Sequence, residues 1–563
     1  MRRKVFALAL DAVPPLLLEA WLAGGAMPNL ARLRGRGAYG ALRKAQDHPH
    51  EASWSAFVQG CLPGKSGEWS RHEYDPRSYS LHDRPSYRLE RHPPFYALPG
   101  ERPALVFDVP HAAVLPGLRG TQVLGWGVEE NLFQSASSPA PLFADLVRRH
   151  GPHPFFGGAA ARVLAEDAEG TLASFRLPSL YDAEAMAALE GEIRQAVARR
   201  AAILRELMAP GAWDLALAAS AELHLAMHML WHRGRPHPLS GALPAAPGGD
   251  PLARAARAVD DSLGALLALL PGDAHVAVFS VSGMTANYTD VPTGVFLPEL
   301  LYRLQFGEPA LAPGDAAAPP PPPATHYRRH WKDEIWALRT PRGERDLESP
   351  DAQAARGDAF DWCPLNWYRP LWPRMRAFAL PSFSHGMVRL NLRGREAAGI
   401  VAPADYGRVC DEIGAALRGL VNARSGRPVA HTVARTRADA REDGPHLPPA
   451  DLLVTWDERE CADAVDSPLA GRIGPVPWLR TGGHAPDGFA LLHGPGIAPG
   501  SALPEGATVM DLTATLLEML GIEPPAHVEG RSLISRSGRR GSPPARRARR
   551  PRPPRAATAR GGS

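Results

Sequence analysis

The stretch Trp213-Asp-Leu-Ala-Leu-Ala-Ala-Ser220, followed directly by Ala221-Glu-Leu-His-Leu-Ala-Met-His-Met-Leu-Trp231, shows the pattern that decides the fold. A short apolar run, Leu215–Ser220, is followed by residues with helical spacing. Similar apolar runs occur at Val5–Leu10, Ala104–Val109 and Val276–Ser280. Runs that are buried on both faces and alternate with helices predict an α/β fold, with a mostly parallel sheet flanked by helices.

Polar residues follow these runs, where an open parallel sheet binds its ligands. Asp11 follows the first run, and the segment Ser280-Val-Ser-Gly-Met284 follows the fourth. His224 and His228 follow the third run. If their segment is helical, residues four apart share one face, so both imidazoles can bind one metal ion.

A third histidine, His484, lies in the turn-rich loop Gly482-Gly-His-Ala-Pro-Asp-Gly488. Three neutral imidazoles with one open position are a recognised geometry for catalytic zinc. The alternative is that His224 and His228 are partly buried, hydrogen-bonded residues of a helix-rich rim. A chain with 21 histidines can contain one such pair by chance.

The length of 563 residues and the hydrophobic fraction of 45% fit one large α/β domain with a smaller insert, or two domains. Met387–Arg393 alternates as a strand does, and Ala404–Leu420 has helical spacing. The predicted division is a first core part over residues 1–306, a Pro/Ala-rich linker or loop over 307–326, a smaller α+β insert over 327–450, a final core part over 451–532, and a disordered Arg/Pro-rich tail over 533–563.

The tail accounts for the positive charge of the chain. The formal net charge is +4, and ten arginines with no acid follow residue 532, which leaves −6 for residues 1–532. Contact with nucleic acid is therefore an interpretation for the tail alone. No aromatic residues interleave these arginines as a single-strand platform requires, which favours a solvated extension.

The four cysteines and the N-terminal run limit the class of protein. The cysteines lie far apart without a CxxC pair, which argues against a disulfide framework and a thiolate zinc site. The apolar run at the N-terminus ends at Asp11 after six residues, too short for a signal peptide or a membrane span. We expect a cytoplasmic protein with no membrane-spanning segment.

Several ordered motifs occur along the chain up to about residue 532. They are Met27–Leu33 with Gly37–Gly40, Ser53–Lys65, Asn391–Glu396 with Gly399–Val401, His484–Gly488 with Gly494–Ile497, Asp511–Leu520, and Glu529–Leu533. Together with Asp11, they resemble the type I phosphodiesterase/nucleotide pyrophosphatase family of the alkaline phosphatase superfamily. The resemblance implies two metal ions, usually zinc, a serine or threonine nucleophile, and a small-molecule phosphoester or ester substrate.

The chain departs from the family pattern at four of the seven positions expected to bind metal or supply the nucleophile. His224 stands where the family has an aspartate, and Val281 and Ser282 replace an aspartate and a histidine. The nucleophile position falls on His50, and Ser53, the nearest hydroxyl, would need a shift of three residues. The positions that persist are those of Asp11, His228 and His484.

The resemblance therefore implies a degenerate metal site. One divalent ion, zinc above other metals, would be held by His224, His228 and His484. A second ion would have Asp11 as its only remaining ligand, unless His48, His50 or Glu51 substitutes for the missing ligands.

Two functions follow. The first is a metal-dependent hydrolase in which a metal-bound water attacks the ester and Asp11, with His50 or Glu51, handles protons. The second is a pseudoenzyme, a binding or regulatory relative that kept the fold.

Glu222 is interpreted as a helix-start residue and not a ligand. Arg393 and Arg395 are interpreted as supports of the insert, with contact to a substrate anion as the alternative.

Overall fold

The computed structural model describes residues 3–44, 48–84, 86–89, 91–97, 102–128, 135–155, 183–243, 248–321, 325–326, 329–358 and 360–534. Residues Met1–Leu533 cluster as one compact unit. Nearly all of the predicted arginine-rich tail, and with it the predicted contact to nucleic acid, lies outside the described residues. Among the described helices, none combines the length and the hydropathy that crossing a bilayer requires.

A nine-stranded sheet forms the centre of the molecule and confirms the predicted α/β fold. Strands β1, β5, β6, β8 and β9 run parallel to one another, whereas β21 is antiparallel to both of its neighbours and β7 is antiparallel to β6. In spatial order the strands are β22 (Ser501–Ala502), β2 (Ala38–Leu42), β21 (Gly488–His493), β9 (His275–Ser280), β1 (Val5–Leu10), β8 (Leu215–Ser220), β5 (Ala104–Phe107), β6 (Gly120–Leu124) and β7 (Ala136–Ser138).

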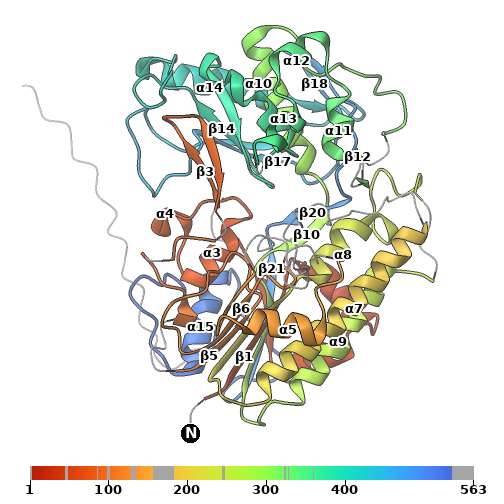
Figure 1. Cartoon of the computed structure of the whole chain (residues 1–563), viewed down its shortest axis with the longest axis vertical. Helices are drawn as coiled ribbons and strands as arrows, with labels where there is room; N and C mark the ends of the chain where they lie inside the picture. The colour runs from red at the N-terminus through yellow and green to blue at the C-terminus, as the bar shows by residue number, and fades with distance from the viewer. Residues whose placement is uncertain are drawn as a thin grey trace, which may run out of the picture. The chain divides into compact units, whose positions relative to one another are not determined.

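Helices cover both faces of this sheet, which is why its central strands are almost entirely apolar. Every residue of β1, β8 and β9 is buried. Figure 1 shows α3 and α15 on one side of the sheet and α5, α7 and α9 on the other. The helices around the sheet are α1 (Pro15–Ala23), α2 (Pro28–Gly35), α3 (Ala52–Gln59), α5 (Leu142–His150), α7 (Ala183–Met208), α8 (Glu222–Leu230), α9 (Pro251–Leu267) and α15 (Val509–Leu520).

A second sheet is antiparallel, and its four strands are β13 (Ala377–Leu380), β14 (Gly386–Leu390), β17 (Leu452–Trp456) and β16 (Ala430–Arg435), in that order. Three of these strands lie among the residues predicted to form the insert, and the fourth, β17, lies in the predicted final core part. Helix α14 (Tyr406–Arg418) lies within the predicted helical segment and packs against β16. Arg395 forms two hydrogen bonds with the buried Asp451 and pairs with Glu396, so this arginine supports the fold of the region.

The remaining elements are short. They are α4 (Pro63–Ser66), β3 (His72–Asp75), β4 (Ser80–Asp83), η1 (Phe95–Ala97), η4 (Trp231–Arg233), β10 (Gly283–Ala286), η5 (Pro292–Phe296), α10 (Leu297–Phe306), β11 (Thr325–His326), β12 (Arg329–His330), α11 (Trp331–Trp336), α12 (Pro341–Asp346), α13 (Pro350–Ala355), η6 (Pro364–Arg374), η7 (Pro403–Asp405), β15 (Val421–Asn422), β18 (Val465–Ser467), β19 (Gly471–Ile473) and β20 (Gly482–Ala485).

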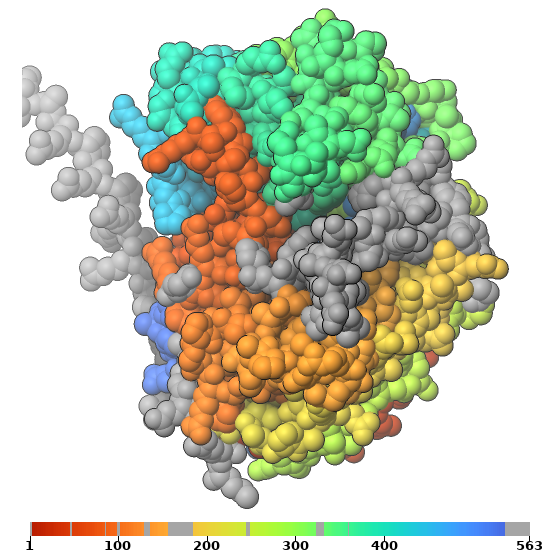
Figure 2. Space-filling view, viewed as in Figure 1, coloured from red at the N-terminus to blue at the C-terminus, as the bar shows by residue number. Residues whose placement is uncertain are grey.

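The hairpin of β3 and β4 connects the N-terminal part of the chain to the second sheet. Tyr74 packs its ring against Trp372 and Phe378, and the Tyr79 hydroxyl donates a 2.7 Å hydrogen bond to Asn391 Oδ1. In Figure 2 the hairpin, in orange-red, lies against the green-to-teal surface of the later residues. These aromatic contacts hold the second sheet to the N-terminal part of the chain.

A buried arginine ties the start of α8 to two neighbouring strands. Arg200 of α7 donates to Glu222 Oε1 at 2.6 Å and to Asp108 Oδ2 at 2.8 Å, and all three side chains are nearly inaccessible to solvent. Glu222 is the first residue of α8, as interpreted from the sequence. The network therefore fixes the helix that carries His224 and His228.

We expect Arg200→Met to lower the free energy of unfolding by about 3–5 kcal/mol, because it leaves two buried carboxylates without their counter-ion. Arg194→Met is the control, since Arg194 lies on the exposed face of the same helix. Urea unfolding of both variants measures the effect. A loss of less than about 1 kcal/mol in Arg200→Met would contradict this interpretation.

Candidate metal centre

The ends of two parallel strands, β1 and β8, position the first polar residues of the site. Leu10, the last residue of β1, pairs with Ser220, the last residue of β8. Asp11 and the start of α8 consequently leave the sheet side by side, and the Asp11 backbone N–H donates to the Ser220 carbonyl at 3.0 Å. The adjacent Ala12 has a φ of 58°, a left-handed conformation that glycine adopts more readily.

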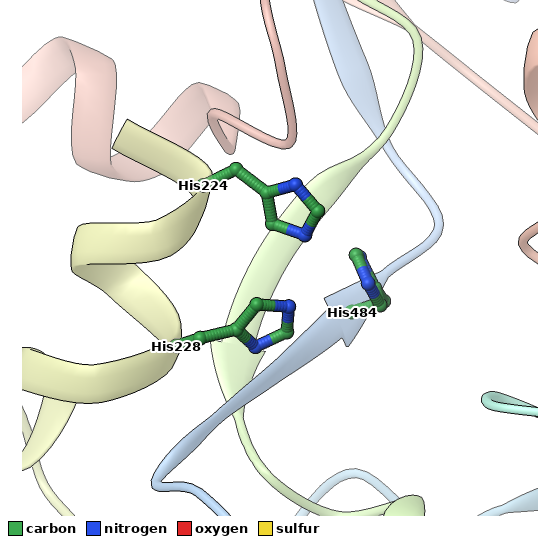
Figure 3. Close-up of side chains that lie close together, drawn as sticks. All are labelled: His224, His228 and His484. Carbon is green, nitrogen blue, oxygen red and sulfur yellow. The ribbon is translucent and has the colours of Figure 1, made fainter. Parts of the chain in front are cut away.

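Three histidines meet beside this edge of the sheet. One nitrogen each of His224, His228 and His484 forms a group whose members all lie within 4.8 Å of one another. The first two rings extend from α8 and the third from β20, and all three point toward a common space (Figure 3). Ligands of a tetrahedral zinc ion lie about 3.3 Å apart. The rings therefore need only small movements to share one ion.

Glycine permits the close approach of β20 to α8. A Cβ atom at Gly482 would lie 2.2 Å from the Met227 carbonyl oxygen, and one at Gly483 would lie 2.9 Å from Asn287 Cα. Strand β20 also pairs with β10, so that His484 faces Met284. Close backbone contact on both sides thus holds His484 against the two histidines of α8.

The hydrogen bonds of the rings fit a metal site. His228 Nδ1 lies 2.7 Å from the Gly482 carbonyl oxygen and His224 Nδ1 lies 2.9 Å from Asp11 Oδ2, so each ring directs its Nε2 lone pair elsewhere. Metal-binding histidines are held in this way by a carbonyl or carboxylate. The Nδ1 atom of His484 is buried and has no hydrogen-bond partner among the described residues. The donor set therefore fits a divalent ion such as zinc.

Asp11 contacts the histidine group as an orienting residue. Its carboxylate accepts from Trp54 Nε1 at 3.1 Å as well as from His224. Burial by itself would raise the pKa of Asp11, but His224, His50 and the Trp54 N–H together lower that pKa below its usual value. The structure thus places an ionised carboxylate behind His224 Nδ1.

Burial also keeps the other rings neutral. Desolvation lowers the pKa of His228 well below its usual value, and the charge of Arg480 lowers it further. Desolvation and the neighbouring His50 do the same for His484. Neutral imidazoles are the form that binds metal ions.

Arg480 is a residue of the site that the sequence reasoning missed. Its Nη1 lies 2.9 Å from His228 Nε2, the nitrogen of that ring that the Gly482 carbonyl does not use. Its Nε donates to Asp290 Oδ2 at 2.8 Å. The only signal in the sequence was its place four residues before His484.

The other predicted site residues, His50, Glu51 and Ser53, lie in three different surroundings. The His50 ring stacks on His484 with 3.7 Å between ring centroids, and desolvation lowers its pKa to about 3. Glu51 directs its carboxylate to the Phe383 backbone N–H at 2.7 Å. Ser53 is nearly buried in α3 and lines a cavity. The structure therefore brings His50 to the three histidines and gives Glu51 a contact with another segment.

This cavity has a volume of about 630 Å³ and lies beside the histidines. His50, Ser53 and His484 line it, together with Thr455 of β17 and Glu458, which follows that strand. Small-molecule sites are commonly about 300–1,000 Å³. The cavity is large enough for a small substrate next to His484.

No family model and no curated protein matches the chain. Similar solved structures include phosphonoacetate hydrolase from Sinorhizobium meliloti 1021 in complex with phosphonoformate, which is 15% identical with a TM-score of 0.44 and covers 92% of this chain and 96% of its own. The murine ectonucleotide pyrophosphatase/phosphodiesterase 5, in complex with AMP, is 11% identical with a TM-score of 0.44 and covers 93% and 96%.

The human ectonucleotide pyrophosphatase/phosphodiesterase 5 is 10% identical, with a TM-score of 0.41 and coverage of 93% and 96%. Two of these solved structures are ectonucleotide pyrophosphatase/phosphodiesterases, the kind of protein that the sequence motifs resemble. At such identities and TM-scores, the likeness assigns to this chain neither an activity nor a family.

Proposed function

We propose that the chain is a metal-dependent hydrolase of the alkaline phosphatase superfamily that acts on a small phosphoester or other ester. One zinc-like ion would be held by His224, His228 and His484. The observation that carries this proposal is the convergence of their three ring nitrogens within 4.8 Å, two of the rings being oriented by hydrogen bonds at Nδ1. A cytoplasmic location is part of the proposal and is supported by four free cysteines.

Each residue of the site has a proposed task. A divalent ion held by these residues would supply Lewis-acid chemistry and would lower the pKa of a bound water. Asp11 holds the His224 ring in the tautomer that leaves Nε2 unprotonated. Asp11 and His50 are the proposed proton-handling groups. Glu51 is the alternative to His50: one of its carboxylate oxygens accepts the Phe383 N–H, and the other has no hydrogen-bond partner among the described residues.

The cavity beside His484 is the proposed substrate site. Ser53 and Thr455 offer hydroxyl groups along its wall, and Lys44 offers a cation. Hydroxyl and ammonium donors suit the oxygens of a phosphoester or carboxylic ester. Ser53 is accordingly assigned to substrate binding, and the covalent nucleophile typical of the family is not assigned to any residue.

A pseudoenzyme is the second candidate, and the Arg480 contact favours it. A guanidinium group at His228 Nε2 stands where a metal ion would bind. The replacement of two family ligands by Val281 and Ser282 agrees with that reading. A binding or regulatory relative would keep the fold and the cavity without turnover.

Metal content and an ester panel separate the two candidates. The hydrolase proposal predicts about one zinc ion per purified full-length chain by elemental analysis. It also predicts hydrolysis of at least one of bis-p-nitrophenyl phosphate, p-nitrophenyl phosphate and p-nitrophenyl acetate, lost on treatment with chelator and restored by zinc. A protein without zinc that turns over none of the three, even with zinc added, would support the pseudoenzyme.

A further inference from the structure

Arg480 contacts the nitrogen atom through which His228 would bind the proposed metal ion. The geometry points to Arg480 as an internal competitor of the metal ion, a residue that sets the metal affinity of the site by binding His228 Nε2 itself. This inference rests on the proposed function, because it concerns the same ion. It goes beyond that function by assigning a role to a residue that is not a ligand.

The His228 ring has only one nitrogen to offer. Its Nδ1 is 2.7 Å from the Gly482 carbonyl oxygen, which can only accept, so Nδ1 carries the proton and Nε2 carries the lone pair. Arg480 Nη1 lies 2.9 Å from Nε2, and a guanidinium can only donate. A zinc ion about 2.0–2.1 Å from Nε2 would need the same lone pair. Arg480 and the ion therefore exclude each other at this nitrogen.

Arg480 is held in this position from two directions. Its Nε donates to Asp290 Oδ2, and its backbone carbonyl accepts from Asn287 Nδ2 at 2.9 Å. Asn287 also donates to Asp290 Oδ2 at 2.8 Å. Only 13% of the Arg480 side chain and 7% of the Asp290 side chain are exposed. This anchoring makes the guanidinium a persistent neighbour of His228, unlike a mobile surface side chain.

Two physical effects then oppose metal binding. The ion must break a hydrogen bond to a charged donor, which is among the stronger hydrogen bonds in proteins. A divalent cation must also approach a buried positive charge, where water screens the repulsion poorly. Both effects disappear when the guanidinium is removed. Metal affinity should therefore rise in a variant that lacks the charge at position 480.

The test compares zinc affinity in metal-stripped full-length proteins by competition with a chromophoric chelator. We expect Arg480→Gln to bind zinc on the order of 10-fold more tightly than the wild type, a difference of about 1.4 kcal/mol. Because Arg480→Gln leaves the buried Asp290 without its counter-ion, the double variant Arg480→Gln with Asp290→Asn keeps the local charge balanced. It should show the same gain. Cobalt absorption spectra report whether the ion is held by nitrogen ligands in each protein.

Arg472→Gln is the matched control, because Arg472 forms an arginine–aspartate pair with Asp466 in another part of the fold. It should leave zinc affinity unchanged. Equal zinc affinity in the wild type and both position-480 variants would overturn this inference and leave the proposed function intact. Absence of zinc binding in every variant would overturn both. Zinc binding by the position-480 variants alone would support the competitor and identify the wild-type chain as the impaired relative.

Discussion

Replacing His484 by alanine is expected to lower the zinc affinity of the chain by more than about 100-fold. Loss of a residue that only orients a ligand costs about 10–100-fold, and loss of one of three protein ligands should cost more. Hydrolysis of any ester that the wild type turns over should fall in parallel. Chelator competition and elemental analysis measure the effect, with His82→Ala as control, because His82 is an exposed residue of β4.

The variant Asp11→Asn tests whether Asp11 orients the His224 ring or binds the metal ion itself. Asp11 contacts His224 Nδ1, so an asparagine should lower zinc affinity by only about 10–100-fold. A loss as large as that of His484→Ala would mean that the Asp11 carboxylate binds the ion directly. A His484→Ala protein that retains wild-type zinc affinity would contradict the proposed site, provided that its unfolding in the presence of chelator resembles that of the wild type.

The second large effect is a loss of stability in mild acid. Burial lowers the pKa of His48 and His232 to about 3 and that of His237 to about 4, from a usual value of 6.5. The positive charge of Lys44 contributes at His48, and that of Arg233 contributes at His232. The folded protein thus keeps these rings neutral at pH values where the unfolded chain protonates them.

The stability from these rings is fully present above pH 6.5 and is lost as the pH falls toward 4 for His237 and toward 3 for His48 and His232. Each ring should reduce the free energy of unfolding by up to about 1.4 kcal/mol per pH unit within this window. Urea unfolding at pH 7, 6 and 5, with the same chelator at each pH, measures the slope. His237→Gln should make the slope shallower by about one proton, whereas His82→Gln should not. A stability that is constant from pH 7 to 5 would contradict the prediction.

The parallel part of the sheet could be predicted because its strands are uninterrupted apolar runs. Strands β1 and β8 have the bounds that their runs indicated. Strand β9 begins one residue earlier, at His275, whose ring is satisfied by the Pro495 carbonyl oxygen at 3.2 Å. Strand β5 ends two residues earlier than predicted, because Asp108 has a φ of 57° and leaves the extended conformation. The exact ends of these two strands could not be predicted from local composition, because they depend on contacts and backbone conformation in the folded protein.

The site could be predicted only in part, for a similar reason. The ends of parallel strands share one edge, so the sequence alone could bring Asp11 near His224. The pairing of β10 with β20 joins segments about 200 residues apart and has no periodic signal. The contacts of His484 with His50, and of Arg480 with His228, depend on that pairing. Neither contact could be read from spacing along the chain.

The antiparallel strand β21 has a consequence for the synthesis of the protein. It lies between β2 and β9, two strands that the ribosome makes far earlier. Until residues 488–493 emerge, the backbone groups of β9 that pair with β21 have no strand beside them, and exposed strand edges of this kind promote aggregation. Nascent or truncated chains that stop before this point should therefore depend on chaperones.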